Sequence, residues 1–215
     1  MDNEKRLAAE AAAEVVESGM TVGLGTGSTV AFLLEALAMR RLEITCVATS
    51  LQTEVVARGL GLHVVSFDGE GAPARLDLSI DGADQISREG WLVKGGGAAH
   101  TREKLVEAAS DRFLVIASSD KLVERIAPPI PLELLRFGLA GTLQRLGSAR
   151  IRDVGPSPDG GVIADWTGDV DDPAALALLF ETTPGVIEHG LFPPALVTEV
   201  IVGRGAGVER FRPPR

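Results

Sequence analysis

Glycines alternate with hydroxyl side chains in the segment Gly23–Thr29, which reads Gly-Leu-Gly-Thr-Gly-Ser-Thr. Glycines let backbone N–H groups turn toward a ligand, and the N-terminus of a following helix adds unpaired donors and a partial positive charge. The side chains and backbone of Thr26, Gly27, Ser28 and Thr29 would then contact that ligand. We therefore predict a cradle for an anion, most simply a phosphate. The alternative is a turn that only packs a strand against a helix.

Two better-known nucleotide-binding motifs fit this segment less well. A Walker P-loop needs a lysine followed by serine or threonine, and the segment contains no lysine. A dinucleotide fingerprint needs glycine or alanine where Ser28 stands, and an acidic residue at the end of the second strand, where residues 48–50 are Ala-Thr-Ser. The segment therefore favours phosphate recognition without a dinucleotide.

A second group of polar residues, Asp81-Gly82-Ala83-Asp84, directly follows an apolar run. Two carboxylates three residues apart can hold sugar hydroxyls, shuttle protons or bind a metal. Aspartates that only form a turn are the alternative interpretation.

A third group begins at Lys94, which ends a predicted strand and is followed by Gly95, Gly96 and Gly97 and then by a predicted helix. The lysine is expected to point its ammonium into the same crevice as the aspartates. Glu103 lies about one turn into the helix, where a carboxylate is also favoured by the helix dipole alone. The neighbouring residues 102 and 104 are cationic and are expected on a solvated face. A glycine run between ordered segments favours a site over a spacer.

Short apolar runs alternate with helix-like segments through the first half of the chain, and these elements must position the three groups. The predicted helices are residues 4–18, 28–39, 52–60 and 100–110, and the predicted strands are residues 20–24, 44–48, 62–67, 76–80 and 113–117. This order predicts an α/β fold with a Rossmann-like parallel sheet covered by helices. Ligands of such sheets lie beyond the carboxyl ends of the strands, so the loops after the strands should meet at one edge.

The pattern changes after the proline-rich segment Pro128–Pro131. The predicted order is a strand at 131–135, a helix at 139–146, strands at 149–154 and 161–166, a helix from 172 to 181, and strands at 185–188 and 196–202. Strand, helix, strand, strand, helix, strand is the ferredoxin-like order. We predict a catalytic domain of residues 1–128 plus 204–215, and a smaller ferredoxin-like α+β domain of residues 129–203.

Composition and charge restrict the classes of partner. The 215 residues carry a net charge of −9, which disfavours nucleic acid as a partner and means that a phosphate substrate needs a locally positive pocket. The single cysteine, Cys46, excludes an intramolecular disulfide, and the three histidines are scattered, so no cysteine–histidine metal cluster is expected. The N-terminal residues lack a signal-peptide pattern and no apolar run approaches membrane-spanning length, which predicts a cytoplasmic protein without a membrane partner.

The three groups resemble those of type A ribose-5-phosphate isomerases in their order and spacing, and the resemblance covers nearly the whole chain. It rests on GLGTGST, DGAD, KGGG-AAHTREK, Ser119-Asp120-Lys121, IPLELL at residues 130–135 and PGVIEHGLF at residues 184–192. The resemblance implies interconversion of D-ribose 5-phosphate and D-ribulose 5-phosphate through an enediolate, in the non-oxidative pentose phosphate pathway. It also implies a reaction without cofactor or metal, and a homo-oligomer, either a dimer or a tetramer.

The resemblance also implies a role for each residue. Glu103 would be the base that moves the proton between C2 and C1, and Lys94 would stabilise the negative oxygen of the enediolate. Asp81 would assist ring opening and proton movement at the hydroxyls, and Asp84 would orient the sugar. The remaining implied substrate contacts are Thr26, Gly27, Ser28, Thr29, Gly82, Ala83, Gly95, Gly96 and Gly97, with Lys121 and Lys5 at the phosphate.

The sequence departs from the family pattern at Gln85, where the family usually has an acidic residue, and at Arg136, where it usually has proline. Neither departure removes a proposed catalytic group. Two other classes remain as alternatives, a sugar-phosphate deaminase or lactonase of similar architecture and a non-catalytic sugar-phosphate sensor. Such sensors generally carry a DNA-binding segment, and the sequence shows no basic patch for one.

Overall fold

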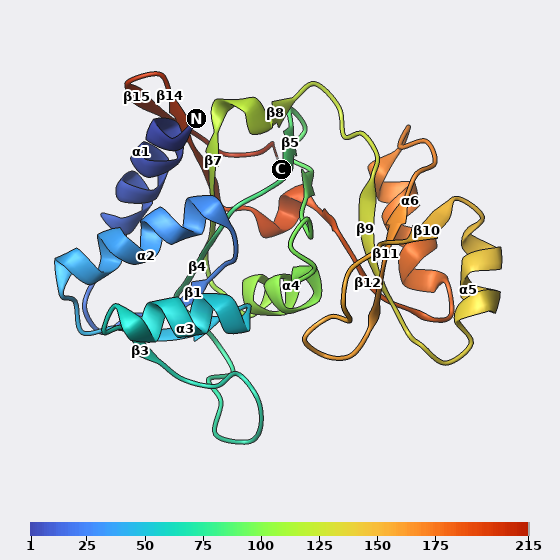
Figure 1. The fold of residues 1–215 in the computed structure, drawn as a ribbon. Helices are drawn as coiled ribbons and strands as arrows, with labels where there is room; N and C mark the ends of the chain where they lie inside the picture. The colour runs from blue at the N-terminus through green and yellow to red at the C-terminus, as the bar shows by residue number, and fades with distance from the viewer. Residues whose placement is uncertain (215) are drawn as a thin grey trace.

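A seven-stranded sheet forms the larger part of the molecule in the computed structural model, which describes residues 1–214 (Figure 1). Its strands, in spatial order, are β15 (Gly207–Phe211), β14 (Glu199–Arg204), β7 (Phe113–Ser118), β4 (Leu78–Asp81), β1 (Thr21–Leu24), β2 (Thr45–Ala48) and β3 (His63–Val64). All neighbouring strands are parallel except β14 and β15. The predicted α/β fold with a Rossmann-like parallel sheet is confirmed.

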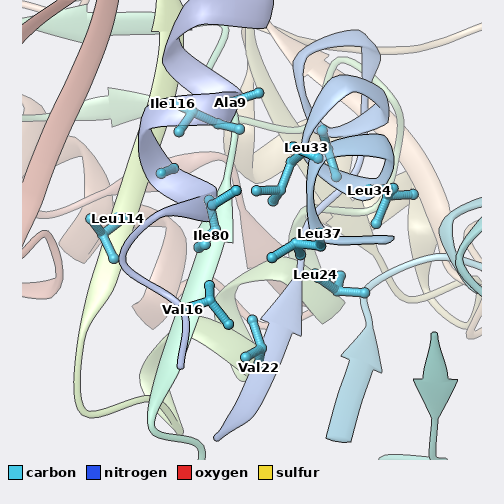
Figure 2. Close-up of a cluster of buried hydrophobic side chains, with 14 of the residues drawn as sticks. Ala9, Val16, Val22, Leu24, Leu33, Leu34, Leu37, Ile80, Leu114 and Ile116 are labelled. Atoms are coloured by element: carbon cyan, nitrogen blue, oxygen red, sulfur yellow. The ribbon is translucent and has the colours of Figure 1, made fainter. Parts of the chain in front are cut away.

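Three helices, α1 (Asp2–Ala13), α2 (Ser28–Arg40) and α3 (Leu51–Gly59), contribute to the apolar core on one face of this sheet. Figure 2 shows α2 side chains pointing toward side chains of β1, β4 and β7 across this core. The labelled residues are Ala9, Val16, Val22, Leu24, Leu33, Leu34, Leu37, Ile80, Leu114 and Ile116. Cys46, on β2, is buried in the same core, as predicted for a strand thiol.

The opposite face of the large sheet packs against helix α4 (His100–Ala108) and a second, small sheet. That sheet has the order β13 (Leu191–Phe192), β6 (Leu92–Val93), β5 (Gln85–Ser87) and β8 (Leu122–Val123), and the 3-10 helix η1 (Ser119–Lys121) precedes β8. The sheet as a whole was not predicted, because strands of two or three residues are too short to show an alternating pattern. It places the end of β6, and therefore Lys94, at the edge of the large sheet.

The third sheet has the order β10 (Ala149–Ile151), β11 (Val162–Trp166), β9 (Ile130–Leu134) and β12 (Val186–His189), and all its neighbours are antiparallel. Helices α5 (Leu139–Leu146) and α6 (Pro173–Thr182) complete the order strand, helix, strand, strand, helix, strand. The predicted ferredoxin-like unit is therefore present, on the right in Figure 1. Both tryptophans of the chain, Trp91 and Trp166, pack against its core.

Several predicted elements differ from the structure, among them the strands predicted at 62–67 and 149–154, which are the shorter β3 (His63–Val64) and β10 (Ala149–Ile151). The strand predicted at residues 196–202 within the small domain is the 3-10 helix η2 (Pro194–Leu196) followed by β14, which pairs with β7 and β15 in the large sheet. Ile201 packs into one core of the large sheet and Val200 and Val202 into the other, so β14 is buried on both faces, as a strand inside a parallel sheet must be. The first helix ends at Ala13 rather than at residue 18.

The limits of the two predicted domains stay predictions, although β15 does return to the large sheet as expected. No helix within residues 1–214 is long and apolar enough to cross a membrane.

Candidate active site

A cavity of about 200 Å³ lies at the carboxyl edge of the large sheet, between the loops that follow β1 and β4 and the start of α4. Every residue of the predicted site lines this cavity except Asp81. Met1 and Asp120 also line it and were not predicted. The structure therefore brings together groups that are spread over residues 5–121 of the sequence.

Asp81 does not line the cavity but contacts both the loop after β1 and Lys94. Its Oδ1 accepts hydrogen bonds from the N–H groups of Thr26 at 3.0 Å and Gly82 at 2.6 Å. Its Oδ2 lies 2.8 Å from Nζ of Lys94. A side chain at Gly25 would place Cβ 1.9 Å from Cγ of Asp81, so this close approach requires glycine.

The ammonium of Lys94 is buried among carboxylates. Nζ donates to the carbonyl oxygen of Gly82 at 2.6 Å and lies 3.5 Å from Glu103 Oε2 and 3.4 Å from Glu107 Oε1. Burial opposes the charge of Lys94, but the carboxylates of Asp81, Glu103 and Glu107 outweigh it and raise the pKa of Lys94 above its ordinary value. Lys94 is therefore a permanent cation at neutral pH.

Glu103 is buried at the start of α4, with only 4% of its surface exposed, and it lines the cavity. Burial raises its pKa to about 8; the charge of Lys94 works against this rise and that of Asp81 adds to it. A carboxyl with this pKa can accept and return a proton near neutral pH, which is the requirement for a general base.

The glycine loop after Lys94 supplies backbone donors to the cavity. The N–H of Gly96 donates to Oδ2 of Asp84 at 2.9 Å, which fixes that carboxylate at the cavity wall. A side chain at Gly95 would place Cβ 2.7 Å from Nδ1 of His100, and the φ angle of Gly95 is +104°. Both observations explain why the loop needs glycine at its first position.

The opposite side of the cavity carries the groups expected for a phosphate. Helix α2 begins after Gly27 with no side chain capping its N–H groups, and Nζ of Lys5 lies 3.1 Å from Oγ of Ser28. Lys121 lines the same side. These two cations and the helix N-terminus place positive charge on this side of the cavity in a chain of net charge −9.

Helix α1 is anchored close to Lys5 through the side chain of Glu4. Its carboxylate accepts from the backbone N–H groups of Gly205 at 2.8 Å and Ser119 at 3.0 Å, and these bonds lower the pKa of Glu4 to about 2. The carboxylate remains ionised over the physiological range, so the anchor persists where Lys5 is needed.

Sequence reasoning missed Glu107, which is buried one turn after Glu103 on the same face of α4. The spacing of four residues was the signal that could have identified it. Burial raises the pKa of Glu107 well above its ordinary value, and the negative charge of Asp81 contributes to the rise although Lys94 opposes it.

The expectation of a solvated face for residues 102 and 104 was wrong for Lys104. Its Nζ lies 2.6 Å from Glu188 Oε1 and donates to the carbonyl oxygen of His189 at 2.7 Å, both on β12. The reason is that α4 packs between the large sheet and β12 of the ferredoxin-like unit, so this side of the helix is covered. Arg102 pairs with Asp159 at 2.7 Å.

The arrangement combines a carboxylate base, an adjacent fixed cation and backbone N–H donors around a cavity with an anion-binding side. These groups can remove a proton beside a carbonyl and stabilise the oxyanion that results. Within residues 1–214, no three or more histidine, cysteine, aspartate or glutamate side chains are grouped so as to hold a metal ion.

Comparison with known proteins agrees with this geometry. The sequence model of the family described as Ribose 5-phosphate isomerase A (phosphoriboisomerase A) matches residues 45–207. The chain is 44% identical to ribose-5-phosphate isomerase A of Caulobacter sp. (strain K31), over 99% of both chains.

Solved structures give the same relationship. The crystal structure of ribose 5 phosphate isomerase A from Neisseria gonorrhoeae superimposes with a TM-score of 0.92 at 31% identity, covering 98% of this chain and 96% of that one. A D-ribose-5-phosphate isomerase in complex with phospho-erythronic acid superimposes with a TM-score of 0.88 at 32% identity, over 97% of both chains. With the family match, the full-length identity and the shared fold in agreement, the chain belongs to the ribose 5-phosphate isomerase A family.

Proposed function

We propose that Glu103 is the base with which this enzyme interconverts D-ribose 5-phosphate and D-ribulose 5-phosphate. The isomerase activity itself follows from membership of the family and from identity over nearly the full chain. The observation that carries the assignment of Glu103 is its position, buried at the cavity with Oε2 3.5 Å from Nζ of Lys94. The raised pKa of Glu103, about 8, supports the same role.

In the forward reaction, ionised Glu103 removes the proton from C2 of the open-chain aldose. The electron pair of the C2–H bond forms the C1–C2 double bond, and the carbonyl oxygen at C1 becomes negative. Lys94 stabilises this oxygen, which is the step where a fixed cation in a dry site contributes most. A proton then moves from the C2 hydroxyl to the C1 oxygen, and Glu103 returns its proton to C1, which leaves the ketone at C2.

The remaining groups bind and orient the sugar phosphate. Asp81 assists ring opening and proton movement at the hydroxyls, and its contact with Lys94 couples it to the reacting oxygens. Asp84, held by the N–H of Gly96, orients the sugar hydroxyls. The phosphate lies at the loop Thr26–Thr29, where Lys5 contributes charge.

Two further observations support this assignment. The relative that was solved with phospho-erythronic acid holds a ligand with an acid group and a phosphate, and an enediolate of a phosphorylated pentose carries the same pairing of anionic groups. In this chain, the side of the cavity with Lys5 and Lys121 would receive the phosphate, and the side with Lys94 and Glu103 would receive the enediolate.

We also propose that the enzyme forms a homo-oligomer, with a dimer or tetramer as the predicted states. Large apolar side chains are exposed on the ferredoxin-like unit, among them Phe137 at 88% and Leu178 at 59%. Burial of these side chains between copies would stabilise the assembly. The cytoplasmic location also stays a prediction.

The assignment of Glu103 is tested by mixing EDTA-treated protein with ribose 5-phosphate and measuring ribulose 5-phosphate directly. The Glu103→Gln variant should lose about 10²- to 10⁴-fold in kcat, since that is the usual contribution of a general base. Its affinity for ribose 5-phosphate, measured by calorimetry, should remain close to that of the wild type. Glu54→Gln, on the exposed surface of α3, is the matched control and should turn over normally.

Equal turnover by wild type and Glu103→Gln would refute Glu103 as the base and move the role to Asp81. Saturable binding by the wild type without turnover would indicate a sensor. Release of ammonia from an amino-sugar phosphate would indicate a deaminase instead.

A further inference from the structure

Arg152 reaches from the ferredoxin-like unit to the glycine loop of the active site. It directly follows β10, and its guanidinium forms two bonds with the carboxylate of Asp165 on β11, Nε to Oδ2 at 2.9 Å and Nη2 to Oδ1 at 2.5 Å. Its Nη1 donates to the carbonyl oxygens of Gly95 at 2.9 Å and Gly96 at 3.2 Å. The guanidinium is therefore fixed on one side by a carboxylate and fixes the loop on the other.

The carbonyl contacts determine where the loop directs its N–H groups. In a planar trans peptide, the N–H points away from the C=O of the same unit. Because the carbonyl of Gly95 faces Arg152, the N–H of Gly96 faces the opposite way, where it donates to Asp84 at 2.9 Å. By the same geometry, the carbonyl contact of Gly96 turns the N–H of Gly97 away from Arg152.

Gly97 lines the cavity, and within residues 1–214 its N–H has no acceptor. A donor in this position is available to an oxygen of the bound sugar. Glycine loops lose more conformational entropy on ordering than other segments, so a loop of three successive glycines needs an external contact to hold one conformation. Within the loop, the N–H of Ala98 donates to the carbonyl oxygen of Gly95 at 3.1 Å, and Arg152 adds the contacts from outside it, to the carbonyl oxygens of both Gly95 and Gly96.

We propose that Arg152 is a positioning residue for the isomerase reaction, holding the loop Gly95–Gly97 so that Gly96 orients Asp84 and Gly97 presents its N–H to the sugar. The inference rests on the proposed function of the cavity, and it adds a residue of the ferredoxin-like unit to the machinery. Hydrogen bonds to Asp165 raise the pKa of Arg152 above its ordinary value, although partial burial opposes this, and the charge of Asp84 adds to the rise. The guanidinium is therefore charged at every pH at which the enzyme works.

The experiment compares the wild type with Arg152→Gln, Arg152→Lys and a matched control, Arg150→Gln. Arg150 lies on β10, is exposed, and donates to the carbonyl oxygens of Gly147 and Ala149 beside it. We expect Arg152→Gln to lower kcat/KM for ribose 5-phosphate about 10- to 100-fold, the range of a lost charge-assisted hydrogen bond. Arg152→Lys should recover part of the loss, since it can still donate to a carbonyl, and Arg150→Gln should match the wild type.

Ligand binding separates positioning from a general loss of structure. Arg152→Gln should weaken the binding of phospho-erythronic acid, which requires the sugar side of the cavity. It should leave the affinity for inorganic phosphate unchanged, because the hydrogen bonds of Arg152 go to Asp165 and to the glycine loop, whereas Lys5 is bonded to Ser28. Thermal unfolding of each variant shows whether it is folded. If Arg152→Gln is not folded, the two ligand affinities are compared between the wild type and Arg152→Lys.

A double-mutant cycle with Asp84→Asn tests the route through Gly96. If Arg152 acts through Asp84, the loss caused by Arg152→Gln should be clearly smaller in the Asp84→Asn background. Three results would each overturn the proposal. The first is a kcat/KM of Arg152→Gln within twofold of the wild type, and the second is an equal loss of affinity for phosphate and for phospho-erythronic acid. The third is full additivity of Arg152→Gln and Asp84→Asn in kcat/KM. An inactive wild type would instead refute the proposed function, so the two failures are distinguishable.

Discussion

The basicity of Glu103 results from two opposing influences on one carboxyl group. A position in the first turn of α4 favours the ionised form through the helix dipole, and Lys94 favours it further. Burial outweighs both and raises the pKa of Glu103 to about 8. The side chain is therefore divided between its protonated and ionised forms near neutral pH, which suits a group that must take a proton and return it.

This pKa predicts the pH dependence of catalysis. As the proposed base, Glu103 would remove the C2 proton only in its ionised form, so kcat/KM should rise with pH and level off above an apparent pKa of about 8. The second ionisation of the substrate phosphate falls near pH 6, about two units lower. The change in kcat/KM that it causes can therefore be separated from the change caused by Glu103. The measurement is kcat/KM for ribose 5-phosphate from pH 6 to 9.5.

A profile that is flat between pH 7 and 9 would show that Glu103 is fully ionised there and that burial does not control its basicity. Residual activity of Glu103→Gln should lack the limb near pH 8.

Side chains carried by compact motifs could be predicted from the sequence, and isolated ones could not. Lys94 and Glu103 stand in a glycine-rich motif that predicts a site without reference to distant residues. Glu107 becomes significant only when α4 is packed and its carboxyl is buried beside Lys94. Arg152 contacts carbonyls 56 and 57 positions away in sequence, a pairing that no local pattern encodes.

At the scale of elements, helix α1 and strand β14 approach each other more closely than side chains allow. A Cβ at Gly203 would lie 1.9 Å from the backbone carbonyl oxygen of Glu4. The contact is backbone to backbone, so no rotamer change can relieve it. Since Lys5 is the next residue, this packing also determines where the phosphate-side cation lies.

Gly203→Ala should therefore destabilise the protein and weaken substrate binding together. Overpacking of this kind costs about 1–3 kcal/mol, and displacement of α1 should raise KM for ribose 5-phosphate by moving Lys5. Urea unfolding and steady-state kinetics measure the two effects. Gly207→Ala, on the neighbouring strand β15 with its nearest atom 4.0 Å from the added Cβ, is the control and should change neither.

If Gly203→Ala matches the control in both stability and KM, the close approach of α1 does not fix Lys5. Lower stability with an unchanged KM would separate the packing of α1 from the position of the phosphate-side cation.

Elements of four or more residues were largely predictable, because each contains at least one full period of its apolar pattern. The segment 28–39 was expected as a helix and forms α2 at Ser28–Arg40. The two-residue strands β6 and β13 contain too few positions to show alternation, and their sheet exists only because distant segments pair. β14 was predicted as a strand but assigned to the wrong sheet, because an apolar segment does not indicate which strands it will pair with.

At the scale of the whole molecule, the buried acids and histidines make stability depend on pH in opposite directions. His100 and His189 have pKa values lowered to about 3, mainly by burial, so the unfolded chain binds more protons at these sites up to about pH 6.5 and stability rises with pH there. Glu103 and Glu107 have raised pKa values, so the folded chain binds more protons at these sites and stability falls as pH rises above the ordinary carboxyl value.

Above pH 6.5 the histidine effect has ended, and the raised pKa of Glu103 should make the free energy of unfolding fall as pH rises toward about 8. In Glu103→Gln this slope should be smaller by up to roughly 1.4 kcal/mol per pH unit, the effect of one proton. Urea unfolding of both proteins at half-unit steps from pH 6 to 8.5 measures the difference. Parallel curves would mean that Glu103 titrates alike in the folded and unfolded chain.

The overall plan of two units could be predicted, whereas the way in which the chain joins them could not. The alternation of strands and helices, and the later ferredoxin-like order, each describe one unit by itself. The connection between the two units depends on contacts between segments far apart in sequence, such as β13 with β6, where Leu191 pairs with Val93. Such contacts have no local sequence signature.

The distribution of three side chains provides built-in reporters for the two cores. The chain contains no tyrosine, and both tryptophans lie beside the core of the ferredoxin-like unit. The tryptophan fluorescence of the protein therefore reports on that region. The single thiol, Cys46, is buried in the core of the large sheet, where burial raises its pKa to about 12 and prevents its reaction with thiol reagents until that core opens. Emission and thiol reactivity recorded in the same urea series therefore show, without any added label, whether the two cores open in one cooperative event or in turn.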